Sequence, residues 1–157
     1  MRAVLQITER CLLTCEGKTV SSCGRGMCVL LGFQTNDTPK EADLLIDKIL
    51  KMRVFHDENG KLNLSALQIG ADILVVSNFT LYANTASRRP DFLRSMKYEP
   101  AKELYGYFLD TMRSRAASLR EEGTGDVKIF PGVFGGDMKV TIVNDGPITI
   151  LLDTDEM

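Results

Sequence analysis

Two short segments of the chain carry side chains suited to chemistry, and the first is residues 77–83, Ser-Asn-Phe-Thr-Leu-Tyr-Ala. It directly follows the apolar run 73–76, Ile-Leu-Val-Val. Hydroxyl and amide groups at the end of a buried strand are well placed to line a pocket, because the sheet fixes the position of the strand end. The same groups can instead satisfy nearby backbone atoms, and by itself the segment favours that simpler interpretation.

The second segment, residues 144–149, reads Asn-Asp-Gly-Pro-Ile-Thr. Asn and Asp before Gly-Pro predict a hairpin connection between two strands. The functional alternative is a cis bond between Gly146 and Pro147 that points two successive carbonyl groups into a pocket, where they meet a substrate ammonium group. Only about 5–6% of X–Pro bonds in folded proteins are cis, so the residues alone leave both interpretations open.

The remaining reactive side chains argue against metal or triad chemistry. The sole histidine, His56, precedes the turn sequence 57–60 and is expected to be exposed. The cysteines lack the paired short spacing of a zinc or redox motif and are expected to be reduced thiols packed in strands; they are Cys11, Cys15, Cys23 and Cys28. We therefore expect no metal and no cofactor, and a metal hydrolase built on these residues is the weakest hypothesis.

Length and composition predict a single domain, residues 1–157, since 44% of the residues are hydrophobic and 25% are charged. The first residues lack the apolar region of a secretion signal, and no apolar run approaches the roughly 20 residues that span a bilayer. We expect a cytoplasmic protein with no membrane partner.

The net charge of −2 conceals a local excess of positive charge. Between Thr85 and Arg120 there are eight basic and four acidic residues, so this segment carries a net charge of +4 and the rest of the chain −6. A basic face on an otherwise acidic protein is compatible with an RNA partner, although charge on a helix is more often a solvated surface.

Periodicity and turn signals predict a mixed α+β chain. The sequence Thr38-Pro39-Lys40-Glu41 predicts the start of one helix, because it supplies an N-cap hydroxyl, a proline at the first helical position and a capping-box glutamate. A second helix is expected from near Pro100 to about Arg120, ended by Gly123 and Gly125, and residues 61–70 are expected to be a loop. Strands are expected over 3–7, 12–15, 18–22, 27–33, 53–55, 72–77, 127–130, 138–143 and 148–152.

Together these segments resemble the D-aminoacyl-tRNA deacylase family. That family is marked by Ser-Gln-x-x-Leu-Tyr-Ala and Asn-x-Gly-Pro-(Val/Ile/Phe)-Thr motifs, which residues 77–83 and 144–149 resemble. Asn78 stands where the family usually has glutamine, and Ile7 where an arginine near the Gly-Pro turn is common. Further matches extend the likeness, in order, over nearly the whole chain, at residues 1–4, 29–32, 57–63, 88–92 and 134–138.

The resemblance implies an α/β fold in which mixed, largely antiparallel sheets form a barrel-like core with two main helices packed outside. It implies hydrolysis of the ester of D-aminoacyl-tRNA, and of glycine mischarged on tRNA-Ala, as proofreading of translation. It also implies a homodimer in which the cis turn of Gly146 and Pro147 reaches the partner's pocket and blocks L-aminoacyl groups.

The resemblance assigns Thr80 and Ser77 to the neighbourhood of the scissile ester as catalytic residues. It assigns the chirality filter to Gly146 and Pro147, and substrate contacts to Asn78, Phe79, Met138 and Thr149, with the terminal adenosine of tRNA held by backbone groups and Phe79.

For the reaction, backbone amides near Phe79 and Thr80 are the hypothetical oxyanion donors. The motif offers no histidine or lysine to activate a threonine. Attack by water assisted by the RNA 2′-hydroxyl, with Thr80 orienting, is therefore favoured over a threonine nucleophile. The alternative function is a non-catalytic, dimeric nucleic-acid-binding module, motivated by the departures at Ile7 and Asn78.

Overall fold

A computed structural model describes residues 1–120 and 125–157 of the chain. The expected end of the second helix at Gly123 lies outside the described residues. In chain order the elements are β1 (Arg2–Cys15), β2 (Lys18–Cys23), β3 (Gly26–Gly32), α1 (Pro39–Lys51), β4 (Phe55–His56), β5 (Leu62–Leu64), α2 (Ala66–Ile69), β6 (Asp72–Ser77), the 3-10 helix η1 (Phe79–Tyr82), α3 (Tyr98–Ser118), β7 (Lys128–Pro131), β8 (Met138–Asp153) and the 3-10 helix η2 (Thr154–Glu156).

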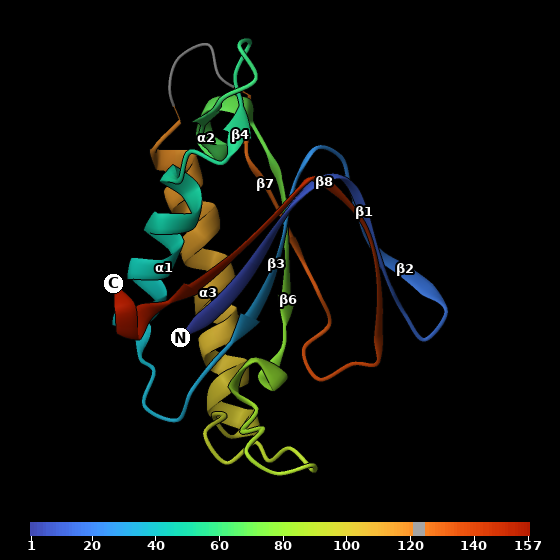
Figure 1. Cartoon of the computed structure of the whole chain (residues 1–157), viewed down its shortest axis with the longest axis vertical. Helices are drawn as coiled ribbons and strands as arrows, with labels where there is room; N and C mark the ends of the chain where they lie inside the picture. Colours follow the sequence, from blue (N-terminus) through green and yellow to red (C-terminus); the bar gives the residue numbers. More distant parts are fainter. Residues whose placement is uncertain (121–124) are drawn as a thin grey trace.

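The main sheet is mixed and strongly curled. Strands β2, β1, β3, β6 and β7 follow one another in that order, and β8 pairs with β1. The pairs that involve β1 are antiparallel, whereas β3–β6 and β6–β7 are parallel. The Ser21 hydroxyl in β2 donates to the Pro131 carbonyl in β7 at 2.8 Å, which brings the two ends of the strand order together. The sheet is thus the barrel-like core that was expected (Figure 1).

Each face of the sheet buries its own apolar cluster. On β6, Ile73 and Val75 belong to the larger cluster, which includes the apolar faces of α1 and α3, the two helices that lie together on one side of the sheet (Figure 1). Leu74 and Val76 face the opposite way, because side chains alternate along a strand. They join a smaller cluster with Cys11, Leu13, Cys23 and Cys28.

The first helix begins as its sequence predicts. The Thr38 hydroxyl accepts from the Lys40 amide at 3.3 Å, and the Thr38 amide donates to the Glu41 carboxylate at 2.8 Å. None of the helices within the two described ranges is both long and apolar enough to cross a membrane.

Residues 61–70 were wrongly expected to be a loop. They form β5 and the single-turn helix α2, which has its own capping box between Ser65 and Gln68. The spacing Ser-x-x-Gln was a readable signal, but one helical turn is too short to show periodicity. The strand expected at 53–55 is instead the two-residue strand Phe55–His56, which shares only Phe55 with the expected range. His56 is exposed, as predicted.

The hairpin expected at residues 144–147 was also wrong, since the chain does not reverse there. Both halves of β8 pair antiparallel with the same strand, β1, which is 14 residues long. Between the pairs Arg10–Val143 and Gln6–Thr149, β1 advances by four residues and β8 by six. The Gly-Pro segment is therefore a bulge of two extra residues within one continuous strand.

Candidate active site

A cavity of about 540 Å³ opens where β6 ends, a size typical of small-molecule sites. Three sequence-predicted residues follow one another in its lining, Ser77, Asn78 and Phe79, and a fourth, Met138, reaches it from the start of β8. The remaining lining residues are Leu31, Phe33, Phe92, Ser95, Met96, Tyr98, Ala101, Phe134, Gly135 and Gly136.

The main chain at the end of β6 is held in place by contacts with β3. The Asn78 amide donates to the Leu31 carbonyl at 2.7 Å, which extends the parallel pairing of β3 and β6 by one residue. A Cβ atom at Gly32 would lie only 2.9 Å from the Asn78 carbonyl oxygen. Glycine is therefore required at position 32 for the segment 77–82, hereafter the pocket wall, to approach β3.

Within the pocket wall, the side chain of Asn78 holds Thr80. Its Oδ1 accepts from the Thr80 amide at 3.2 Å and also from the Thr80 hydroxyl. An amide oxygen accepts hydrogen bonds but does not take up a proton at neutral pH. The Thr80 hydroxyl is therefore paired with an acceptor that cannot serve as a base. Thr80 itself is exposed and is absent from the cavity lining.

Two aromatic pairs flank the cavity. Phe79, 57% exposed, meets Phe92 edge to face at 4.9 Å between ring centroids, and Tyr98 meets Phe134 in the same way at 5.2 Å. The Ser95 hydroxyl donates to the Phe79 carbonyl at 2.9 Å and so ties the segment after η1 to the pocket wall. Apart from Phe79, these residues were missed as site residues, although 88–92 and 134–138 were among the matching segments.

The Gly146–Pro147 peptide bond is cis, as the resemblance implied. Both residues are exposed, and neither lines the cavity of its own chain. Thr149, also exposed, pairs with Gln6 in β1 and likewise lies outside the lining. The second motif is therefore not brought to the first within a single chain.

Sequence reasoning missed the residue that braces this bulge, Asn144. Its Nδ2 donates to the Ile7 carbonyl at 2.8 Å and to the Ile148 carbonyl at 2.9 Å, across the base of the bulge. Ile7 contributes its main chain here, since its side chain is 3% exposed and packs in the larger apolar cluster. The segment Asn144–Ile148 is called the bulge below.

The four cysteines lie in β1, β2 and β3, and His56 is exposed in β4. All four thiols are free, and burial raises the pKa of Cys28 to about 12, which keeps that thiol protonated at neutral pH. Over residues 1–120 and 125–157, no three His, Cys, Asp or Glu side chains gather in a metal-binding arrangement.

Comparisons with known proteins place these features in a family. Residues 4–153 match the family model described as D-Tyr-tRNA(Tyr) deacylase. A D-aminoacyl-tRNA deacylase of Clostridium beijerinckii is 44% identical over 155 residues, which cover 98% of this chain and 97% of that protein. One from Deinococcus deserti is 43% identical over 154 residues, covering 98% of this chain and 99% of that protein.

Solved structures are similar over the same length. The c-Myc DNA Unwinding Element Binding Protein superposes with a TM-score of 0.85 at 40% identity, covering 98% of each chain. A structure described as a probable eukaryotic D-amino acid tRNA deacylase gives a TM-score of 0.79 at 19% identity, covering 96% of this chain and 97% of that one, and it supports the fold alone.

Proposed function

This chain belongs to the D-Tyr-tRNA(Tyr) deacylase family, and we propose that it hydrolyses the ester of D-aminoacyl-tRNA in the cytoplasm, acting through one domain that spans residues 1–157. Water adds to the ester carbonyl, the bond from that carbon to the ribose oxygen breaks, and a proton passes to the ribose oxygen. The products are a free D-amino acid and tRNA, which makes the reaction a proofreading step of translation.

The observation that carries this proposal is the cavity at the end of β6, where the family's first motif forms the wall. Its lining is largely apolar and aromatic, with Ser77 and Asn78 as polar groups beside the exposed ring of Phe79. Such a site suits an amino-acid side chain together with a terminal nucleoside, because bases stack on aromatic rings.

For the chemical step, the contacts of Thr80 favour an orienting role over a nucleophilic one. Its hydroxyl proton is directed to an amide oxygen that cannot act as a base. An aminoacyl ester is already activated, so attack by water assisted by the RNA 2′-hydroxyl needs chiefly placed donors.

The contacts also refine the hypothesis for those donors. The Thr80 amide is occupied by Asn78. The Phe79 amide is the first of η1 and so has no partner within that helix. We assign the oxyanion contact to Phe79, with Ser77 beside the ester.

Rejection of L-aminoacyl groups is assigned to Gly146 and Pro147 of a second copy of the chain. Within one chain these residues are exposed and stand outside the cavity, so this assignment requires a homodimer in which they reach the partner's pocket. A pocket rejects a bulky group by clash far more strongly than it favours one additional methylene by contact. Glycyl-tRNA, which lacks a side chain on the blocked side, should pass the filter.

Purified protein incubated with D- and L-tyrosyl-tRNA tests the activity, with hydrolysis of the D-ester alone as the expected result. Two variants test the roles. Thr80→Ala should lower turnover only about tenfold, as expected for an orienting group, whereas a loss of many orders of magnitude would contradict attack by RNA-assisted water. Pro147→Ala, which removes the ring from the filter, should begin to hydrolyse the L-ester; complete sparing of that ester would contradict the filter.

A second candidate function is a non-catalytic nucleic-acid-binding module. It is favoured by the 40% identity to a protein named for binding a DNA unwinding element. The hydrolysis assay separates the two, because a binding module would hydrolyse neither ester. It would still bind nucleic acid.

A further inference from the structure

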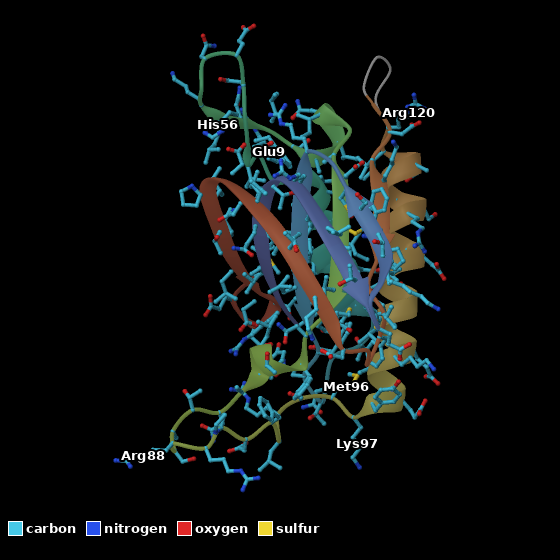
Figure 2. The ribbon with its side chains drawn as sticks, turned by 90° about the vertical axis from the view of Figure 1, so that its right-hand side faces the viewer. Glu9, His56, Arg88, Met96, Lys97 and Arg120 are labelled. Atoms are coloured by element: carbon cyan, nitrogen blue, oxygen red, sulfur yellow. The ribbon has the colours of Figure 1, made fainter. Side chains whose placement is uncertain are left out.

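The segment 83–97, which joins η1 to α3 and is called the rim loop below, combines pocket lining with positive charge. Phe92, Ser95 and Met96 line the cavity. The four cations of the loop are exposed and alternate with these residues along the chain; they are Arg88, Arg89, Arg94 and Lys97. In Figure 2, Met96 lies close to the folded body, while Arg88 and Lys97 point outward at the same end of the molecule.

The structure divides the basic segment noted in the sequence into two parts. On and just after α3, Arg113 pairs with Asp110, Arg115 with Asp43 and Asp47, and Arg120 with Asp126, all at 2.7–3.2 Å. These three charges are paired within the protein, whereas Lys102 on α3 has no ion pair within the described ranges. The basic face expected over 85–120 is therefore concentrated on the rim loop.

The rim-loop cations, in contrast, have no carboxylate partner within the described ranges. The only acid of the loop, Asp91, is occupied by the Asn84 side-chain amide at 2.9 Å and the Leu93 backbone amide at 3.2 Å. With four cations and one acid the rim loop carries +3, so the rest of the chain, which totals −2, carries −5. The net charges therefore favour the approach of a polyanion to this loop over the rest of the surface as a whole.

We propose that the rim loop binds phosphates of the single-stranded acceptor end of tRNA while the aminoacyl ester occupies the cavity. The proposal rests on the proposed function and adds the surface that holds the rest of the substrate. A nucleotide chain that leaves the cavity past Phe79 and Phe92 must cross this loop, because Ser95 joins the loop to the pocket wall. Contacts between arginine and phosphate supply affinity and position without reading bases.

The test compares two double variants that each remove two exposed positive charges. Arg88→Ala/Arg89→Ala removes them from the rim loop. Lys48→Ala/Lys61→Ala, the control, removes them from the far end of the molecule, near the end of α1 and the β4–β5 turn (Figure 1). Each protein is assayed on D-tyrosyl-tRNA and on D-tyrosyl-adenosine, an ester of the same nucleoside without phosphate.

For the rim-loop variant, KM for D-tyrosyl-tRNA should rise about tenfold at moderate salt, with kcat within about twofold of the wild type. The slope of log(kcat/KM) against log salt should become shallower by about 0.7 for each phosphate that the variant no longer neutralises. Hydrolysis of D-tyrosyl-adenosine should be unchanged, and the control variant should match the wild type on both esters.

An unchanged KM and salt slope for the rim-loop variant would overturn the proposal. So would an equal decrease on D-tyrosyl-adenosine, since the loop would then shape the cavity rather than hold RNA. Tighter binding of duplex DNA than of deacylated tRNA would overturn it as well. If the wild type hydrolyses neither ester, the proposed function fails, and the salt-dependent affinity of deacylated tRNA for the two variants still tests the loop.

Discussion

The pocket wall, residues 77–82, and the bulge, Asn144–Ile148, carry the two motifs but are held in opposite ways. The wall follows β6, which has parallel neighbours on both sides, and its main chain packs against Gly32. The bulge lies in β8, whose only partner in the described sheet is β1, and the side chain of Asn144 spans its base. The position of the wall thus depends on the whole sheet, whereas the bulge is held by its pairing with one strand and by the side chain of Asn144.

A single guanidinium connects the two motif-bearing parts. Arg2 Nε donates to Asp153 at the end of β8 at 2.6 Å, and Arg2 Nη1 donates to the Leu81 carbonyl in η1 at 3.1 Å. The same group stacks over the Tyr82 ring at 4.7 Å from the centroid.

The pocket wall and the bulge are thus supported differently. We expect changes in the wall to reduce stability and all activity, and changes in the bulge to reduce selectivity for the D-ester.

The largest effect is expected for Gly32→Ala. The added Cβ meets the Asn78 carbonyl oxygen at 2.9 Å, so the wall must shift. Overpacking of this kind costs about 1–3 kcal/mol of unfolding free energy, and hydrolysis of D-tyrosyl-tRNA should fall at least about tenfold. Chemical denaturation and steady-state kinetics measure the two quantities.

The matched control is Gly106→Ala in α3, where an added Cβ meets nothing within 4 Å. It should be neutral or stabilising by up to about 1 kcal/mol, because alanine favours a helix over glycine. A Gly32→Ala protein as stable and active as this control would show that the close approach of the wall is dispensable.

Next is Asn144→Ala, which leaves the carbonyls of Ile7 and Ile148 without their shared donor. We expect a loss of about 1–2 kcal/mol in unfolding free energy and increased hydrolysis of L-tyrosyl-tRNA, with the rate on the D-ester nearly unchanged. The control is Asp145→Ala at the exposed neighbouring position. Equal loss of activity on both esters would make the bulge part of the catalytic wall rather than a filter.

Asn78→Ala should have a smaller effect on stability, about 1 kcal/mol, because it removes the side-chain cap of η1. It also frees the Thr80 hydroxyl, so kcat on D-tyrosyl-tRNA should fall about tenfold. Asn78→Asp, which keeps an acceptor oxygen, should retain the stability. If both variants behave like the wild type, Thr80 does not need to be oriented.

The smallest effect concerns the Arg2–Asp153 ion pair. Burial alone would raise the pKa of Asp153, but hydrogen bonds from Arg2 and the Asp155 amide, with the charge of Arg2, outweigh it and lower the pKa below its usual value. A lowered carboxyl pKa stabilises the fold above the ordinary value of about 4, and this stabilisation is lost as pH falls through the folded-state pKa.

Asp153→Asn should therefore cost roughly 0.5–1 kcal/mol at pH 7, and the difference from the wild type should shrink as the pH falls below about 4. Urea denaturation at several pH values measures it. A difference that stays constant down to about pH 2 would assign the effect to altered packing rather than to the ion pair.

Elements whose cause is local could be predicted from residue types and their spacing. The capping box at Thr38 and Glu41 specifies the start of α1, because its hydrogen bonds join residues only three apart. The run 73–76 was predicted as a buried strand from its apolar residues, and β6 has the predicted bounds, Asp72–Ser77. The two motifs, and with them the family, were also readable from order and spacing.

The positions at which distant segments meet could be seen only in the folded structure. Asn-Asp-Gly-Pro reads locally as a hairpin, yet β1 pairs with β8 on both sides of these residues and the chain runs on as a bulge. The same distant pairing brings Met138 to the cavity and leaves Gly146 outside it. The register of β1 against β8 joins segments more than a hundred residues apart in the chain, so the residue types of either segment alone do not set it.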